Sequence, residues 1–531
     1  MGIQDDLHHP GEYNENEVPT RSAQMIWVLR ALGVVMAGIV WLLLGGQEGL
    51  SEDARIVAAV GTLMAIWWMT EAIPLSATAL LPIVLIPALT ETTVGQATQP
   101  YASSIVFLFL GGFLIAIAME KWHLHTRIAL LTLRKVGVAP RRIVLGMMLA
   151  TGFLSMWVSN TATTLMMLPI GLSVLSLVVE RGSRQDGAAA EDAMKAGGTI
   201  TDVVKDPNIS AFGVCLVLSI AWAASMGGLG TLLGSPPNAI VAGYASDELG
   251  RNIGFLEWMV LGTPLAFIFI FIAWFLMTRV LYRFDLPEIP GGKQMIEDQV
   301  RDLGALSQGE KMVLAVFLGA AFLWIVPGLL TSIPAIEAAA PWLGNLDDTA
   351  IAIGAGLAMF LLPGKGRDKM VLDWKDAEAG LPWGVLLLFG GGLSLASAVA
   401  SSGLDSWFGQ QVTGLGSLPT ILLVAAVVTI ILFLTEITSN TATAATFIPI
   451  LGGVALGIGA DAMTLLIPAA LAATCAFMLP VGTPPNAIVF GTGTVTIAQM
   501  ARGGFVLNVV GILLITGLTY LLGGLALGLT F

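Results

Sequence analysis

Two copies of one polar motif interrupt long apolar stretches of this chain. Residues 159–170 read SNTATTLMMLPI, and residues 439–450, 280 positions later, read SNTATAATFIPI. Ser and Thr hydroxyls and the Asn amide provide both hydrogen-bond donors and acceptors. Such groups are tolerated at membrane depth where they are buried in protein or line a wet cavity. Each Ser-Asn-Thr tip can therefore bind a small anion, such as a carboxylate, without an arginine.

A second polar motif also occurs twice. Residues 234–243 read GSPPNAIVAG, and residues 482–491 read GTPPNAIVFG. Two consecutive prolines break a helix, because they remove two amide donors and clash with the preceding turn. The carbonyls freed before the break can ligate a small hard cation such as Na⁺, and the helix N-terminus after it can receive an anion. No Lys or Arg lies near either motif, so we expect co-bound cations, held by backbone carbonyls, to offset the charge of the anion.

Each motif has a structural alternative. One Ser/Thr-rich patch is more often interhelical glue, and one Pro-Pro kink is mostly structural. The pairing of both motifs favours a functional site. Glu436 lies three residues before the second Ser-Asn-Thr; it is either functional, as intramembrane acids usually are, or an acceptor of structural hydrogen bonds. His123 and His125 lie in a basic segment and are expected to be solvated, whereas Cys215 and Cys475 are expected to be buried small hydrophobes.

The composition indicates a chain whose solvent is mostly lipid. Of its 531 residues 56% are hydrophobic and only 11% are charged, too few to cover the surface of soluble domains. The net charge of −12 argues against nucleic acid as a partner. Residues 1–24 are polar and acidic, so we expect a disordered cytosolic tail there and not a signal peptide.

The elements that position the motifs are predicted to be membrane helices of about 20 residues. We expect about eleven spans, near residues 25–45, 54–70, 73–90, 103–119, 211–243, 255–278, 312–330, 348–363, 383–400, 464–491 and 505–528. Two further stretches, 143–178 and 419–457, are predicted to be re-entrant hairpins with the Ser-Asn-Thr motifs at their tips. With a cytosolic N-terminus, this topology places every Lys and Arg except Arg55 and Arg251 on the cytosolic side, as the positive-inside rule requires.

The motifs define two repeats of opposite orientation. LFLGGFL at 108–114 matches LFGGGLS at 388–394, so the order of Gly-rich helix, hairpin and Pro-Pro-Asn break occurs twice. The first repeat is predicted to span residues 25–300, with hairpin 143–178 and broken helix 211–243. The second is predicted to span residues 301–531, with hairpin 419–457 and broken helix 464–491. Because the hairpins open to opposite sides, the repeats are inverted, which is typical of secondary transporters.

These residues resemble the divalent anion/sodium symporter family. The resemblance runs from about Met25 onward and includes TEAIPLSATALLP at 70–82, FLGGFLIAIAMEKW at 109–122, both SNTAT tips and both PPNAI breaks. It implies an all-α membrane protein of the elevator type, a homodimer in the plasma membrane with a fixed scaffold and a moving transport domain. It also implies sodium-coupled import of four-carbon dicarboxylates such as succinate, malate and fumarate.

The resemblance further implies which residues bind. The first sodium site would use Ser155, Ser159, Asn160 and Gly234, and the second would use Thr435, Thr438, Asn440 and Gly482. The substrate carboxylates would contact Ser159, Asn160, Thr161 and Ser235 on one side, and Asn440, Thr441 and Thr483 on the other.

Other functions remain open at this point. Sodium-independent dicarboxylate exchange, or transport of citrate or sulfate, is compatible with the same family. An intramembrane enzyme is not expected, because the chain has no HExxH, GxSxG or paired intramembrane aspartates. A channel would not need two inverted hairpins around an occluded site.

Overall fold

A computed structural model describes residues 22–182, 206–286, 292–331, 333–366, 369–411 and 413–530. Within these ranges the chain is almost entirely helical, apart from two short antiparallel strands, β1 (Pro363–Lys365) and β2 (Lys369–Met370). The all-α fold expected from the sequence is thereby confirmed. The predicted disordered tail lies outside the described residues except for its last three, and residues 183–205, most of the polar stretch at 180–210, also lie outside them.

Nine helical stretches among the described residues are long and apolar enough to cross a membrane. They are Gln24–Gly46, Val94–Lys121, Asn160–Val179, Pro207–Gly227, Phe255–Leu281, Gln308–Thr331, Trp383–Ser402, Asn440–Gly457 and Ile497–Leu527. Four shorter apolar helical stretches cover Leu75–Leu89, Asp348–Leu361, Thr420–Thr435 and Ala462–Ala473. The expected span at 54–70 corresponds to helix α2 (Glu52–Thr70). The expected span at 73–90 is divided into two helices, α3 (Leu75–Thr78) and α4 (Leu81–Leu89).

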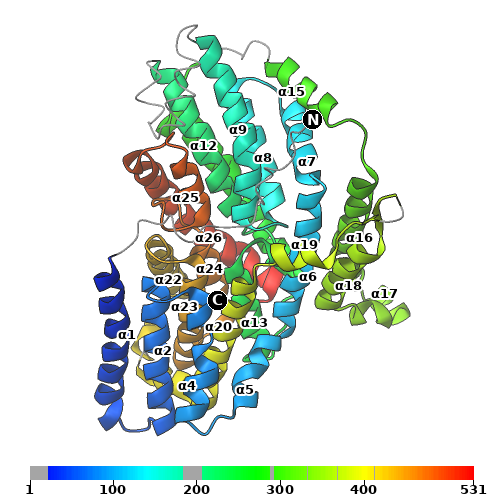
Figure 1. The fold of residues 1–531 in the computed structure, drawn as a ribbon. Helices are drawn as coiled ribbons and strands as arrows, with labels where there is room; N and C mark the ends of the chain where they lie inside the picture. The colour runs from blue at the N-terminus through cyan, green and yellow to red at the C-terminus, as the bar shows by residue number, and fades with distance from the viewer. Residues whose placement is uncertain are drawn as a thin grey trace.

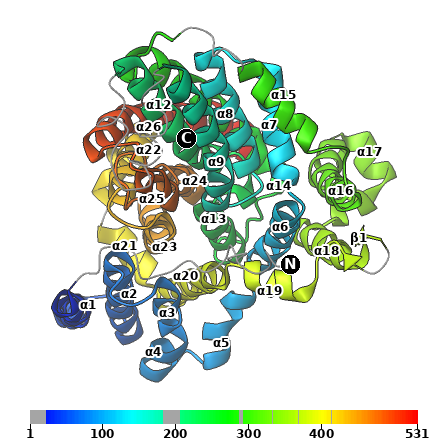
Figure 2. The same cartoon turned by 45° about the horizontal axis from the view of Figure 1, so that its top comes forward.

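The first half of the chain begins with helices α1, α2, α3 and α4, which lie together at one edge of the molecule (Figure 2). Its elements are α1 (Ala23–Leu43), η1 (Leu44–Gly46), α2 (Glu52–Thr70), α3 (Leu75–Thr78), α4 (Leu81–Leu89), α5 (Val94–Thr98), η2 (Gln99–Ala102), α6 (Ser104–Lys121), α7 (Leu124–Val136), α8 (Pro140–Ser155), α9 (Asn160–Gly182), α12 (Pro207–Gly227), η3 (Leu232–Gly234), α13 (Pro236–Asp247), α14 (Phe255–Leu276), η4 (Met277–Leu281) and α15 (Gly292–Asp302). Glu71 ends α2 in a left-handed conformation with φ 48°.

The second half repeats the helix–hairpin–broken helix order. Its elements are α16 (Gln308–Thr331), α17 (Pro334–Ala339), η5 (Pro341–Asn345), α18 (Asp348–Leu361), α19 (Trp374–Gly380), α20 (Trp383–Ser402), α21 (Leu404–Gln411), η6 (Thr413–Ser417), α22 (Thr420–Thr435), α23 (Asn440–Gly457), α24 (Ala462–Ala473), α25 (Pro484–Gly491) and α26 (Ile497–Leu527). Glycines let some of these helices approach closely: a Cβ at Gly111 of α6 would collide with the backbone of Ala352 in α18.

The two hairpins occupy opposite halves of the molecule. In Figure 1 the pair α8–α9 lies in the upper half and the pair α22–α23 in the lower half. The broken helices run in opposite directions as well, since α12 lies above α13 whereas α24 lies below α25 (Figure 1). Each hairpin packs against the broken helix of its own half, α8 and α9 against α12, and α22 and α23 against α24.

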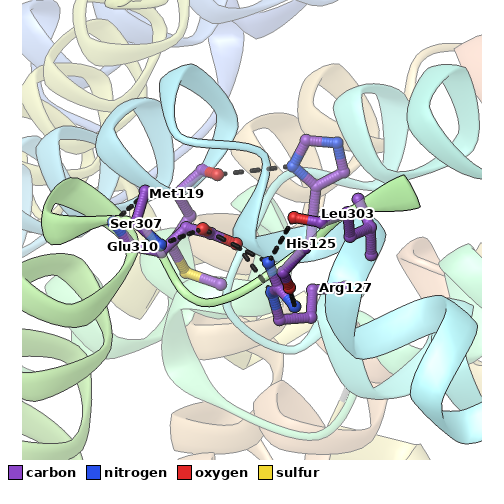
Figure 3. Close-up of polar contacts among 7 residues, drawn as sticks. Met119, His125, Arg127, Leu303, Ser307 and Glu310 are labelled. Carbon is purple, nitrogen blue, oxygen red and sulfur yellow. Dashed lines mark hydrogen bonds and ion pairs between the residues drawn. The ribbon is translucent and has the colours of Figure 1, made fainter. Parts of the chain in front are cut away.

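The segment after α6 is a helix and not the solvated loop expected from its charges. Helix α7 buries His125, which is 6% exposed and whose Nδ1 lies 3.3 Å from the carbonyl oxygen of Met119 (Figure 3). Burial lowers the pKa of His125, so the ring is neutral at pH 7. The expectation of a solvated His125 is therefore wrong, because the alternation of apolar and charged residues in α7 places this ring on the inner face of the helix.

An ion pair ties α7 to the beginning of the second half. Arg127 Nε donates to Glu310 Oε1 at 2.7 Å, and both side chains are nearly buried. The same guanidinium donates to the carbonyl oxygens of Leu303 and Gly304 (Figure 3). These contacts fix α7 to the first turn of α16, although the two segments lie far apart in the sequence.

Candidate functional site

The first Ser-Asn-Thr motif forms the tip between α8 and α9. The amide of Asn160, oriented by its hydrogen-bond partners, donates to Ser155 Oγ at 2.7 Å and to the carbonyl oxygens of Ala224 and Gly234 at 3.0 and 3.2 Å. Ala224 lies in the last turn of α12, and Gly234 lies just before α13 begins. The tip of the hairpin thus faces the break between these two helices.

The second motif has the same geometry at the tip between α22 and α23. The amide of Asn440 donates to Thr435 Oγ1 at 2.7 Å and to the carbonyl oxygens of Ala473 and Gly482 at 3.1 and 3.2 Å. Ala473 is the last residue of α24, and Gly482 precedes α25. The two tips therefore meet the two breaks in the same manner.

Each cluster collects oxygen atoms at the carboxyl end of a broken helix. A side-chain hydroxyl and two backbone carbonyls surround the amide of each tip asparagine. If the amide turned its oxygen inward, four oxygens would converge, a set of neutral ligands that suits a hard cation. The negative end of the helix dipole adds to that attraction.

The asparagines of the Pro-Pro-Asn motifs fix the broken segments from within. Asn238 Nδ2 donates to the carbonyl oxygens of Gly228 and Thr231, both at 2.9 Å. Asn486 Nδ2 donates to those of Ala476 and Leu479 at 3.0 and 3.1 Å. Both asparagines are fully buried. We predicted no role for these two asparagines from the sequence, although their occurrence at the same place in both repeats indicates a shared role.

Some of the predicted cation ligands have other partners. Ser159 Oγ accepts from the amide of Ala162 at 3.2 Å, so this hydroxyl caps the beginning of α9. Thr438 Oγ1 donates to the carbonyl oxygen of Leu434 at 2.9 Å and lies 2.6 Å from Thr443 Oγ1. In this arrangement neither hydroxyl joins the cluster around its tip asparagine, in contrast to Ser155 and Thr435.

The predicted substrate residues lie at the tips and at the breaks. Thr161 and Thr441 each follow a tip asparagine in the first turn of α9 and α23. Ser235 and Thr483 occupy the N-cap positions of α13 and α25, and neither side chain caps its helix. The hydroxyls at the breaks are thus not engaged in capping, and one of them contacts the other half.

Thr474 is a buried polar residue next to the predicted site. We predicted no role for it from the sequence. Its Oγ1 lies 2.9 Å from Ser235 Oγ, and both residues are buried. Thr474 is the C-cap residue that directly follows α24. No repeat signal identified it, because the residue 248 positions earlier is Met226.

A large cavity lies away from this site. It has a volume of about 620 Å³, and its lining includes Asp53, Glu91, Asp247, Glu248 and Ser397. None of the predicted sodium or substrate residues lines it. The candidate site therefore consists of the hairpin tips and the helix breaks, and this cavity is not part of it.

Comparisons with known proteins identify the family of this chain. A family model described as the sodium:sulfate symporter transmembrane region matches residues 23–526. The chain is 41% identical over 495 residues to the sodium-dependent dicarboxylate transporter SdcS of Staphylococcus saprophyticus, covering 92% of this chain and 90% of that protein. It is 40% identical over 518 residues to SdcS of Staphylococcus aureus strain RF122, covering 97% of this chain and 94% of that protein.

Among solved structures, the YdaH transporter of Alcanivorax borkumensis aligns with a TM-score of 0.49 at 12% identity. The alignment covers 95% of this chain and 98% of that one.

Proposed function

This chain belongs to the family of the sodium:sulfate symporter transmembrane region, and from that premise we propose that it is a secondary transporter that couples sodium to the import of four-carbon dicarboxylates. The observation that carries the proposal is the repeated cluster of a tip asparagine, a hydroxyl and two carbonyls, formed by Asn160 with Ser155 and by Asn440 with Thr435. Such a pair of neutral oxygen clusters suits two sodium ions, which are cargo and not resident cofactors.

The substrate class follows from the two related half-sites and from the relatives. A dicarboxylate has two similar anionic ends, and each end would meet one tip and one break. Thr161 and Ser235 would contact one carboxylate, and Thr441 and Thr483 the other. The two SdcS proteins, about 40% identical over most of this chain, are named sodium-dependent dicarboxylate transporters, which supports succinate, malate and fumarate over sulfate.

The proposed mechanism is an elevator, in which one part of the protein carries the site past a fixed part. The hairpins, the broken helices, α14 and α26 would move, and α1–α6, α16, α18 and α20 would form the scaffold of a homodimer in the plasma membrane, with a cytosolic N-terminus. The unequal packing of the two broken helices supports this proposal. Both helices pack on the opposite half, α13 on α23 and α24 and α25 on α12 and α9, but α13 also packs against α20 and α6. Val481 just before α25 is 72% exposed.

The proposal is tested by reconstitution. Purified protein in proteoliposomes should accumulate radiolabelled succinate under an inward sodium gradient, and a potassium gradient of equal size is the control. Uptake that is independent of sodium but requires dicarboxylate inside the vesicles would favour exchange. Malate and fumarate should compete with labelled succinate. Butyrate should not, because it would leave the polar groups of one half-site unpaired, at about 1–3 kcal/mol per group. Strong competition by sulfate or citrate with none by malate would contradict the dicarboxylate assignment.

A further inference from the structure

Glu436 is a buried acid with four hydrogen-bond donors around it. The residue is 3% exposed and lies in the tip between α22 and α23. Its Oε1 accepts from the amide of Phe477 at 2.8 Å, and its Oε2 accepts from the amides of Met478 and Leu479 at 2.9 and 3.3 Å. Asn508 Nδ2, from α26, donates to Oε1 at 2.7 Å. The carboxylate thus binds the amide side of the broken segment between α24 and α25.

This arrangement matches the ionised carboxylate. Each oxygen accepts two hydrogen bonds, and all four partners are donors, so a proton on the carboxyl group would have no acceptor among them. None of the ion pairs found among the described residues includes Glu436. Neutral donors therefore stabilise the charge without cancelling it.

The first hairpin has no acid at the position that matches Glu436. The position 280 residues before Glu436 is Met156. The side chain of Met156 packs against Gly230, where an added Cβ would lie 2.8 Å from the methionine Cε, and the hydroxyl of Thr231 donates to its backbone oxygen. The tip asparagines have the same kinds of partner in both halves, one hydroxyl and two backbone carbonyls, so the carboxylate of Glu436 is a charge that the first cluster lacks.

Glu436 is also in contact with the second oxygen cluster itself. It follows Thr435 directly, and an added Cβ on Gly482 would lie 3.0 Å from the Glu436 carbonyl oxygen. Asn486 binds the carbonyl side of the same segment, at Ala476 and Leu479. Glu436 and Asn486 therefore hold both faces of the segment that leads to Gly482.

We propose that Glu436 is a positioning residue of the second sodium half-site, and that its fixed negative charge makes this half-site bind sodium more tightly than the first. The inference rests on the proposed function, because it assumes that the cluster around Asn440 binds sodium. In a low-dielectric interior an uncompensated negative charge strongly favours a nearby cation. The half-site near Glu436 therefore fills before the one at Asn160, which has only neutral ligands.

The test measures sodium affinity in two ways, by the sodium dependence of succinate uptake in proteoliposomes and by sodium-induced thermal stabilisation of the full chain without substrate. Glu436→Gln should raise the half-saturating sodium concentration about tenfold while the maximal rate at saturating sodium changes less. Glu436→Asp, which keeps the charge, should restore much of the affinity. Thr519→Val, a buried polar change in the same helix as Asn508, is the packing control and should leave sodium affinity unchanged.

Double variants distinguish a positioning role of Glu436 from a general loss of structure. The effect of Glu436→Gln should be non-additive with Thr435→Ala but additive with Ser155→Ala. Unchanged sodium dependence in Glu436→Gln, or additivity with Thr435→Ala, would overturn the proposal. If Glu436→Gln does not fold, Asn508→Ala, which removes one donor and leaves the charge, takes its place and should lower sodium affinity more mildly.

Failure of the proposed function gives a different pattern. Succinate uptake by the wild type that does not respond to sodium would contradict sodium coupling, and the thermal measurement would still report on Glu436. If sodium does not stabilise the wild-type protein against heat more than potassium does, the inference is overturned as well.

Discussion

Ser235 Oγ and Thr474 Oγ1 lie 2.9 Å apart and form a buried hydrogen bond between the two halves of the chain. Ser235 is the residue at which the first broken helix resumes, and Thr474 is the residue at which the second one stops. The two breaks therefore touch at the centre of the molecule, so a substrate that binds Ser235 must displace this bond or share it.

The first prediction concerns this pair. Ser235→Ala should weaken succinate binding by the cost of one unpaired polar group, about 1–3 kcal/mol, or roughly five- to hundredfold. Thr474→Val should weaken it less, because Thr474 is not expected to contact the substrate. Competition against labelled succinate measures both. A larger loss in Thr474→Val than in Ser235→Ala would mean that the threonine, and not the serine, binds the substrate.

The second prediction concerns the tip asparagines and the hydroxyls beside them. Ser155→Ala and Thr435→Ala each remove one expected sodium ligand, so each should raise the half-saturating sodium concentration by roughly five- to hundredfold. Asn160→Ala or Asn440→Ala should abolish uptake, because each asparagine would serve both the cation and the anion. Thr438→Val is the matched comparison. Its hydroxyl bonds to Leu434 in one arm of its own hairpin and to Thr443 in the other, so an effect as large as that of Thr435→Ala would show that it turns into the cluster.

The third prediction concerns topology. A cysteine introduced by Gln294→Cys should react with a membrane-impermeant reagent only from the cytosolic side, and one introduced by Ser406→Cys only from outside. Both positions are exposed, and the native Cys215 and Cys475 are buried. Labelling of both from one side would contradict the inverted arrangement of the repeats.

The fourth prediction concerns the alternate state of the elevator. An added Cβ on Gly243 of α13 would lie 2.8 Å from Ile105 of α6 and 2.9 Å from Leu393 of α20, whereas the matching Gly491 of α25 has nothing within 4 Å. If the repeats exchange roles, Gly491 should approach Val385, the counterpart of Ile105.

Chemical crosslinking tests that approach. The double variant Gly491→Cys with Val385→Cys should crosslink only during turnover, and crosslinking should stop transport. Gly243→Cys with Ile105→Cys, the matched control, should crosslink at rest. Rapid crosslinking of the first pair without sodium and substrate would contradict the proposed motion.

The fifth prediction concerns the ion pair of Figure 3. Arg127→Ala should destabilise the protein by about 3–5 kcal/mol, because it leaves the nearly buried Glu310 without its partner. Lys293→Ala, which removes an exposed pair with Glu297, should cost less than about 1 kcal/mol. Thermal unfolding in detergent compares the two variants. Equal losses would mean that the Arg127 pair behaves as a surface contact.

The sequence by itself determined the features that are local in the chain. Apolar stretches of membrane length, two helix breaks and two polar tips follow from composition and from the missing amides of the prolines, whatever the surroundings. The two repeats were visible because the same residues recur at constant spacing. From these features the all-α membrane fold, the relation to sodium-coupled symporters and the position of Asn160 and Asn440 at two hairpin tips could be predicted.

Only the tertiary structure decided which oxygens meet. The partners of Asn440 lie 33 to 42 residues farther along the chain, at Ala473 and Gly482, and Glu436 finds its partners at Phe477 and Asn508. Such contacts depend on how whole helices pack, because residues so far apart in sequence have no preferred distance of their own. For the same reason the burial of His125 was predicted wrongly from the sequence, and the sequence left open whether the Thr438 hydroxyl faces the cluster or the arms of its own hairpin.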